Sequence, residues 1–501
     1  MILNLSNKFE KKTTEVSIGH RATRGFLWLV GQTVLVKLAS TAGVVILSWF
    51  LMPEDFGLVG LAYTVTAIVG LVQNLGLKEI LIRRQKHYRR WVNAAFWLSL
   101  SVGIAAGVLM AVCSPLAAKI YGEPRLVGLI CILSTTAPLQ ALLTIPLTNL
   151  QIEFRFRAMG ILGVLDGVGT IILSVIFAAL GFGAYSFVMP RPIILGIEAM
   201  IAWVIAPTII HSGMHLSRWR FLLNDSIWLF GTYVLLTMIS QGDYVTLGIF
   251  SSKRETGLYF FAFNLSMQIV TLITGNIASV LLPSLSKFSG DDKRQVGAFV
   301  RASRMISMLG MPLCFAQAVF AAPLFHLFFA PKWYPAIPIF QVLCMGMSMR
   351  VVAGTSQSMM QARGRYRAFF FASLVYLIVF VASVGIGFAS GGVLGLVLGV
   401  AICLLLMEPL QYYVAVKGTD LHAGRATAGT FLPFFIAAML CFGLSWFAVE
   451  WALSGKLPEV IRGVLSVASG TIAYLLWIHW FVKSLWNDVA ERLKALWSRN
   501  A

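Results

Sequence analysis

Seven ionisable residues lie inside long apolar stretches of this sequence, where charged side chains are rare and usually functional. They are Lys37, Asp166, Arg191, Glu198, Asp243, Arg350 and Glu408. Lysine and arginine bind phosphate through charge-assisted hydrogen bonds. A carboxylic acid in a low-dielectric site can exchange protons near neutral pH. These residue types therefore indicate a path for an anionic group, a coupling ion, or charged pairs that lock helices together.

The three cations are candidates for binding a phosphate-bearing substrate. We expect Lys37 and Arg350 to form part of a cationic cavity surface, with Arg191 as a further contact. The alternative is that each cation pairs with an intramembrane carboxylate and holds two helices together. Arg191 has a further alternative, because it lies between two prolines that interrupt a helix and free backbone carbonyls for it to satisfy.

The four acids are candidates for ion or proton coupling. Glu198 and Glu408 could couple transport to a proton gradient or bind a cation, and helix locking explains them equally well. Asp166 and Asp243 are further candidates of the same kind. No residues have the spacing of a metal site, a Walker motif or a nucleophile elbow, so we expect no metal, no cofactor and no catalytic residues.

The elements that position these charges are predicted membrane spans. Of 501 residues, 58% are hydrophobic and only 12% are charged, about half the charge fraction of a soluble domain. Runs of about 20 apolar residues predict an all-α polytopic membrane protein with fourteen spans. The spans are 25–51, 57–77, 94–117, 126–150, 158–180, 183–209, 224–250, 256–282, 299–323, 335–361, 367–390, 392–416, 429–453 and 460–484.

The basic residues predict the orientation of the spans. The two tails and the loops after even-numbered spans hold 29 of the 39 lysines and arginines, and the other loops hold 7. By the positive-inside rule both termini are cytoplasmic. This topology and contact with anionic lipids explain the net charge of +19 without nucleic-acid binding. Residue counting then places Arg191 toward the periplasmic side of the membrane and Asp166 toward the cytoplasmic side.

The first half of the chain recurs in the second half. "LSWFLMPEDFGLVGLAY" (47–63) aligns with "LGIFSSKRETGLYFFAF" (247–263), and "QIEFRFRA" (151–158) aligns with "QARGRYRA" (361–368). The two intramembrane glutamates also lie 210 residues apart. Each half has six spans, so the repeats are parallel and predict two six-helix lobes around a central cavity, an architecture typical of transporters.

The predicted organisation has six parts, from tail to tail. These are the cytoplasmic N-tail 1–24, the N-terminal lobe 25–209, the linker 210–223, the C-terminal lobe 224–416, two additional spans within 429–484 and an amphipathic tail 485–501. The tail places its large apolar residues on one helical stripe, which indicates either a helix in the membrane interface or an extension of the last span.

Five segments resemble the prokaryotic polysaccharide transporter family, the Wzx-like flippases of the multidrug/oligosaccharidyl-lipid/polysaccharide superfamily. They are "MPEDFG" (52–57), "NLGLKEILIRR" (74–84), "GDYVTLGIFSSKRETGLYFFA" (242–262), "VLLPSLSK" (280–287) and "PKWYPAIPIFQVL" (331–343). Asp243 matches the acidic position of that family's seventh span. We interpret Asp55, Gly57 and Gly257 in the matching turns as structural residues that start and pack helices.

The resemblance implies a function and its partners. It implies that the chain moves undecaprenyl-pyrophosphate-linked oligosaccharide from the cytoplasmic to the periplasmic leaflet of the bacterial inner membrane, for exopolysaccharide, capsule or O-antigen assembly. Membrane lipids, a polysaccharide polymerase and export machinery are the expected partners. A cation-coupled multidrug or organic-solute antiporter and a lipid II-type flippase of the same superfamily stay open as alternatives. A membrane-embedded polymerase or glycosyltransferase would need a long catalytic loop, and every loop here is short.

Overall fold

All regular secondary structure among the described residues is helical, and none of these residues forms a strand. A computed structural model describes residues 31–33, 35–71, 77, 81, 88–153, 155–208, 210, 211, 213, 219, 227–287, 291–419 and 421–481. The predicted N-tail and the predicted amphipathic tail lie outside these residues. The predicted all-α fold class is confirmed.

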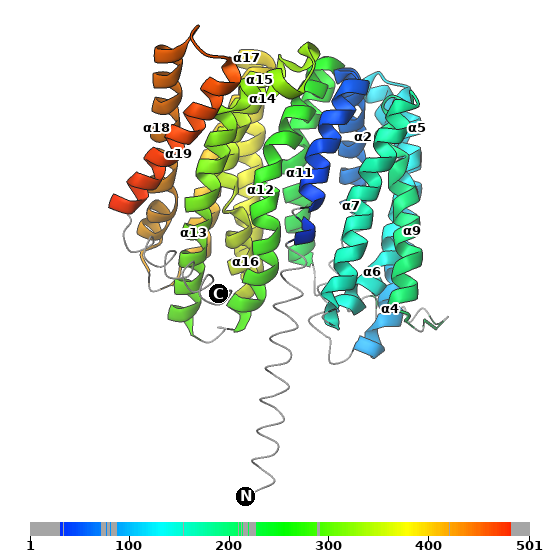
Figure 1. The fold of residues 1–501 in the computed structure, drawn as a ribbon. Helices are drawn as coiled ribbons and strands as arrows, with labels where there is room; N and C mark the ends of the chain where they lie inside the picture. Colours follow the sequence, from blue (N-terminus) through cyan, green and yellow to red (C-terminus); the bar gives the residue numbers. More distant parts are fainter. Residues whose placement is uncertain are drawn as a thin grey trace, which may run out of the picture. The chain divides into compact units, whose positions relative to one another are not determined.

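Residues 1–249 form the first of two compact units. Its helices are Gly31–Phe50, α2 (Pro53–Gly70), α4 (Tyr88–Tyr121), α5 (Arg125–Ser134), α6 (Thr136–Ile152), α7 (Phe156–Ala179), α8 (Tyr185–Val188), α9 (Pro190–Ile205) and α11 (Ile227–Phe250) (Figure 1). Short breaks separate α5 from α6 and α8 from α9, so each of these pairs follows one predicted span.

Residues 250–501 form the second unit. Its helices are α12 (Lys253–Lys287), α13 (Asp292–Val319), α14 (Ala321–Phe328), the 3₁₀ turn η3 (Pro331–Trp333), α15 (Ala336–Arg350), α16 (Ala353–Ala362), α17 (Tyr366–Val416), α18 (Ala423–Leu453) and α19 (Glu459–Phe481). The last two helices pack on each other, and α18 packs on α13 (Figure 1).

The described helices agree with the fourteen-span map. Ten of them are long and apolar enough to cross a membrane, and α13 with α14 adds an eleventh if this bent pair counts as one span. The 51-residue α17 covers two predicted spans, because its backbone leaves the helical region at Gly391 and Gly392. Gly392 has a φ of +58°, which glycine adopts without strain. The helices α2 and α11 cover the remaining predicted spans, the second and the seventh.

The sequence repeat appears as the same backbone turn in both units. Arg155 and Arg365 occupy the residue before α7 and α17, and their N–H groups donate to Leu150 O and Met360 O, each over 2.9 Å. Arg155 Nη1 donates to Ile205 O at the end of α9 over 2.8 Å. Arg365 makes the matching bond to Lys417 O, near the end of α17, over 2.5 Å. Each arginine thus satisfies carbonyls that a helix end would leave unpaired.

The helices α2 and α12 begin with the same kind of hydrogen bond, one in each unit. The N–H of Met52 donates to Asp55 Oδ2 over 3.1 Å at the start of α2, and the N–H of Ser252 donates to Glu255 Oε2 over 3.1 Å at the start of α12. A carboxylate in the first turn of a helix satisfies an orphan donor and suits the helix dipole. The structural interpretation of Asp55 is therefore confirmed.

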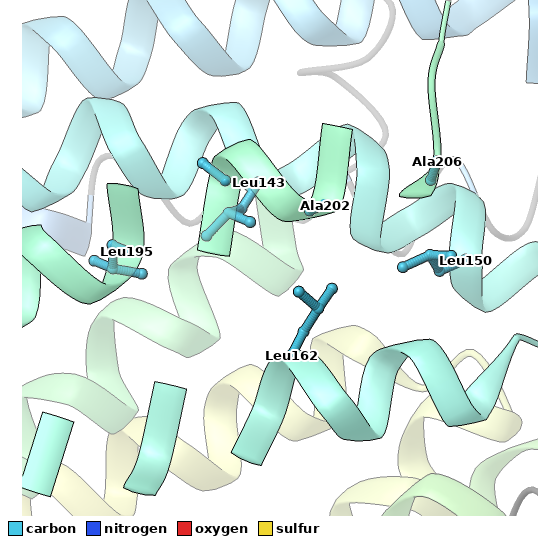
Figure 2. Close-up of a cluster of buried hydrophobic side chains, with 7 residues drawn as sticks. Leu143, Leu150, Leu162, Leu195, Ala202 and Ala206 are labelled. Carbon is cyan, nitrogen blue, oxygen red and sulfur yellow. The ribbon is translucent and has the colours of Figure 1, made fainter. Parts of the chain in front are cut away.

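A buried leucine–alanine cluster holds the helices that carry most of the charges in the first unit. Figure 2 shows the side chains gathered between α6, α7 and α9. They include Leu143 and Leu150 from α6, Leu162 from α7, and Leu195, Ala202 and Ala206 from α9. This packing fixes α7 against α9 because the small alanines allow close approach of the helices.

The helix α11 belongs to the first unit, whereas the sequence analysis assigned residues 224–250 to the C-terminal lobe. Thr64 Oγ1 on α2 donates to Gln241 Oε1 on α11 over 3.1 Å. Gly248 lies against Leu61 and Tyr121, so α11 contacts α2 and the end of α4. The lobe boundaries predicted from the repeat, and the cavity expected between the lobes, stay predictions.

Candidate functional site

The first cluster of intramembrane charges joins α9 to α7. Arg191 forms an ion pair with Asp166, and the two side chains are 30% and 31% exposed. Residue counting placed these two residues toward opposite sides of the membrane, yet the ion pair brings their charged atoms within 4 Å of each other. Counting locates a Cα atom, whereas the guanidinium lies at the far end of a long side chain.

The local sequence explains how Arg191 reaches this position. Helix α8 ends at Val188 and α9 begins at Pro190, and Met189 between them keeps helical dihedral angles (φ −59°, ψ −39°), so the helical path continues to Arg191. A proline at the first helical position lacks only an N–H that would be unpaired there anyway. The prolines therefore do not interrupt the backbone path here, and the guanidinium of Arg191 bonds to the carboxylate of Asp166 on α7.

Glu198 completes this cluster, which we call the N-cluster (Asp166, Arg191 and Glu198). It lies two turns after Arg191 on α9, and its side chain is buried. Both Asp166 and Arg191 act on it electrostatically. One cation therefore lies among two acids, an arrangement that can hold one shared proton or one bound cation.

The second unit has a corresponding C-cluster (Arg350, Tyr376 and Glu408). Glu408 is 4% exposed on α17, and Tyr376 Oη donates a hydrogen bond to its Oε1 over 3.2 Å. Arg350, the last residue of α15, acts on Glu408 electrostatically. Glu408 Oε2 is buried and has no hydrogen-bond partner among the described residues. A buried carboxyl oxygen without a partner is unusual and needs an explanation.

The sequence analysis missed Tyr376. It lies 210 residues after Asp166, as Glu408 lies 210 residues after Glu198. The offset that revealed the repeat was therefore sufficient to find it. The cations do not follow the repeat, because Arg191 shares α9 with its glutamate whereas Arg350 comes from the break between α15 and α16.

Lys37 is placed differently from the two arginines. It is half-buried on the helix Gly31–Phe50, and it forms no ion pair with any carboxylate that the structure describes. Gln32 and Val36 lie against Gly163 and Gly167 of α7, so this helix runs beside α7 and in the same direction. Val36 and Gly167 are the sequence neighbours of Lys37 and Asp166, respectively.

Asp243 lies apart from these clusters in the sequence, on α11. It is 2% exposed, and its Oδ1 accepts a hydrogen bond from the N–H of Tyr244 over 2.9 Å. In the searched part of the chain, no three His, Cys, Asp or Glu side chains gather as metal ligands would.

Long apolar helices with two clusters of buried charge define a polytopic helical membrane protein. The chain belongs to the family described as polysaccharide biosynthesis protein, whose sequence model matches residues 46–338. The resemblance to the polysaccharide transporter family is therefore confirmed.

Relatives match over most of their length. The succinoglycan biosynthesis transport protein ExoT of Rhizobium meliloti (strain 1021) is 23% identical over 93% of this chain and 95% of its own. The lipopolysaccharide biosynthesis protein WzxC of Escherichia coli (strain K12) is 21% identical over 84% of this chain and 86% of its own. Among solved structures, lipid II flippase MurJ in an inward closed conformation has a TM-score of 0.72 and 14% identity, covering 92% of this chain and 99% of its own. That likeness shows a shared fold.

Proposed function

We propose that this chain is a flippase for undecaprenyl-pyrophosphate-linked oligosaccharide repeat units, which it moves from the cytoplasmic to the periplasmic leaflet by alternating access. The observation that carries the proposal is membership of the polysaccharide biosynthesis protein family, with relatives that match over nearly their whole length. The paired units with repeated turns support it, because such repeats are typical of transporters.

Lys37 is our first candidate for the pyrophosphate contact. It is half-buried, and no described carboxylate neutralises it through an ion pair. A cation in such a position is costly unless water or an anionic ligand reaches it. The pyrophosphate of the substrate supplies that anion, through hydrogen bonds to the ammonium group.

The two arginines have less freedom to bind substrate. Arg350 interacts with the single buried Glu408, and a guanidinium has five N–H donors, so it retains donors for a phosphate. Arg191 is already paired with Asp166 and lies near Glu198. We therefore assign Arg350 to contact with the substrate. We assign Arg191 first to the coupling cluster, with contact to the substrate as its secondary role.

The two glutamates are our candidates for energy coupling. Each is buried, each faces a cation, and the repeat relates them. The partner-free oxygen of Glu408 suits a bound proton, because burying a neutral carboxylic acid without partners costs less free energy than burying a carboxylate without partners. Asp166 in the N-cluster and Asp243 on α11 are secondary candidates.

The surroundings follow from this function. The chain is a multi-pass membrane protein, and we place it in the bacterial inner membrane with both termini in the cytoplasm. Reporter fusions at Ala501 and after Lys253 that mark the same compartment contradict this orientation. A polymerase and export machinery that consume the flipped units are proposed partners. The relatives are named as transport and biosynthesis proteins, and we propose no enzymatic activity for this chain.

A lipid II-type flippase is the second candidate, because the fold resembles MurJ over almost the whole of that chain. The two candidates differ in the glycan on the same kind of lipid carrier. Deleting the gene separates them: we expect surface polysaccharide to disappear and its lipid-linked units to accumulate in the cytoplasmic leaflet, while peptidoglycan synthesis continues. Units that reach the periplasm at a normal rate, in cells without a redundant flippase, contradict the proposal.

A further inference from the structure

Three arginines lie on two helices that pack on each other, outside both charge clusters: Arg301 and Arg304 in the first half of α13, and Arg425 in the first turn of α18. Arg304 on α13 lies against Gly429 on α18: a Cβ added to that glycine would come within 2.9 Å of Arg304 Nη2. Arg301 precedes Arg304 by one turn on α13, and Arg425 precedes Gly429 by one turn on α18. Residues one turn apart share a helix face, so all three residues lie along the line where α13 packs on α18, which we call the α13–α18 groove.

The two helices run in the same direction along this groove. Arg304 meets Gly429, and further along both helices Phe315 contacts Phe435 with ring centroids 5.4 Å apart. The sequence topology places the starts of both helices at the cytoplasmic face. The arginines thus border the groove near its expected cytoplasmic mouth.

These positive charges have no negative charge to balance them in the described structure. Arg301, Arg304 and Arg425 form no ion pair with any acid among the described residues, and the buried Nε of Arg304 has no hydrogen-bond partner there. The start of α18 adds positive potential, because its N-cap residue His422 makes no side-chain cap bond. Arg425 in the first turn of α18 is also unfavourable next to the positive helix end.

We propose that this groove binds the phosphate headgroup of a membrane lipid. A phosphate in the groove would neutralise the three guanidinium groups and accept hydrogen bonds from them and from the first turn of α18. Gly429 leaves room for the Arg304 guanidinium, the flexible end of which would have to shift if a side chain stood there. The site uses none of the residues assigned above to the substrate path and does not depend on that assignment.

An apolar surface next to the arginines indicates a lipid as the source of the phosphate. Leu432, Ile436 and Met439 continue the stripe of Arg425 along α18 and are 53%, 44% and 45% exposed. Acyl chains would cover this stripe while the headgroup occupies the groove. A free phosphate ion would not contact these apolar side chains.

Native mass spectrometry of the full-length protein in detergent, titrated with dioleoyl phosphatidylglycerol, tests the site. We expect Arg301→Gln/Arg304→Gln/Arg425→Gln to weaken binding about tenfold or more, because it removes several charge-assisted contacts. Gly429→Ala keeps every charge and shifts only the flexible end of Arg304, so it should weaken binding much less than the triple variant does. Arg304→Lys should restore part of the affinity lost in Arg304→Gln.

The matched control removes three positive charges elsewhere in the same unit, as Lys253→Gln/Arg254→Gln/Lys456→Gln, and should bind the lipid as the wild type does. Melting temperatures of all variants show whether they fold. Equal lipid binding by the wild type and the arginine triple variant overturns the proposal, as does an equal loss in the control. Binding of inorganic pyrophosphate at the same three arginines, without binding of the lipid, also overturns it in favour of a free anion site.

Discussion

Tyr376 donates its hydroxyl hydrogen to Glu408 over 3.2 Å, and these two residues are the counterparts, 210 positions on, of Asp166 and Glu198. Both units therefore place a polar side chain and a buried glutamate at corresponding positions, on α7 and α9 in the first unit and on the two arms of α17 in the second. In the first unit the partner is an acid beside an arginine, and in the second it is a neutral hydroxyl. The clusters are thus related in position but differ in charge, so we expect different tasks for them in one transport cycle.

Removing the hydroxyl of Tyr376 should destabilise the second unit. Tyr376→Phe leaves both oxygens of the buried Glu408 carboxyl without a hydrogen bond from the described residues. An unsatisfied buried polar group costs about 1–3 kcal/mol. Thermal melting of the purified protein measures the loss, with Tyr413→Phe on an exposed face of the same helix as the control. Equal melting temperatures for Tyr376→Phe and the wild type would show that the bond contributes nothing.

The ion pair of Arg191 and Asp166 should show coupling in a double-mutant cycle. Arg191→Gln leaves two acids together without their cation, so we expect a loss of about 1–3 kcal/mol, between the values for surface and buried pairs. Adding Asp166→Asn should recover part of the lost stability, because the repulsion between Asp166 and Glu198 disappears. Chemical or thermal unfolding of the wild type, Arg191→Gln, Asp166→Asn and the double variant measures the coupling free energy. Strictly additive effects would mean that the two side chains do not interact.

Glu198→Gln and Glu408→Gln should slow transport and flatten its dependence on pH if each acid carries a proton during the cycle. Glutamine keeps the shape and hydrogen-bonding capacity of the side chain but cannot lose a proton. Transport in vesicles between about pH 5 and pH 8 measures the effect, with Glu450→Gln near the end of α18 as the control. An unchanged rate and pH profile in both variants reduces the two glutamates to structural residues.

Lys37 should matter for transport and not for folding. Lys37→Arg keeps the charge and should keep much of the transport, whereas Lys37→Ala should abolish transport with an unchanged melting temperature. The reason is that no described carboxylate is paired with Lys37 and would lose its partner. If Lys37 were part of a buried pair, Lys37→Ala would cost about 3–5 kcal/mol, and expression and melting temperature would fall with activity. Normal transport by Lys37→Ala contradicts both interpretations.

The sequence predicts most of the fold because hydropathy and helix breakers act locally. The boundary expected between 390 and 392 coincides with the non-helical Gly391 and Gly392, where the chain reverses within α17. The carboxylate of Asp55 was expected at a helix start, and it bonds there. The assignment of α11 to a unit depends on its contacts with Leu61 and Tyr121, which lie far away in the sequence. No local pattern encodes such contacts.

The site was harder to predict, since the partners of a charge are set by tertiary packing. The sequence identified Arg191 and Asp166 as unusual charges but placed them at different depths, and the structure pairs them. Tyr376 was not among the candidate residues because tyrosine is common in membrane helices, although the 210-residue offset of the repeat relates it to Asp166. The three arginines of the α13–α18 groove were counted among the loop residues, because hydropathy cannot show that the helices bring them together.

The most direct measurement of the central claim is translocation by the purified protein in liposomes. Vesicles would carry a fluorescent undecaprenyl-pyrophosphate oligosaccharide, and a membrane-impermeant quencher would report how much of it reaches the outer leaflet over time. We predict that wild-type protein exchanges the lipid between leaflets much faster than protein-free vesicles do, and that Lys37→Ala does not. Exchange no faster than in protein-free vesicles, by folded protein that instead exports organic cations, would contradict a flippase and favour the antiporter.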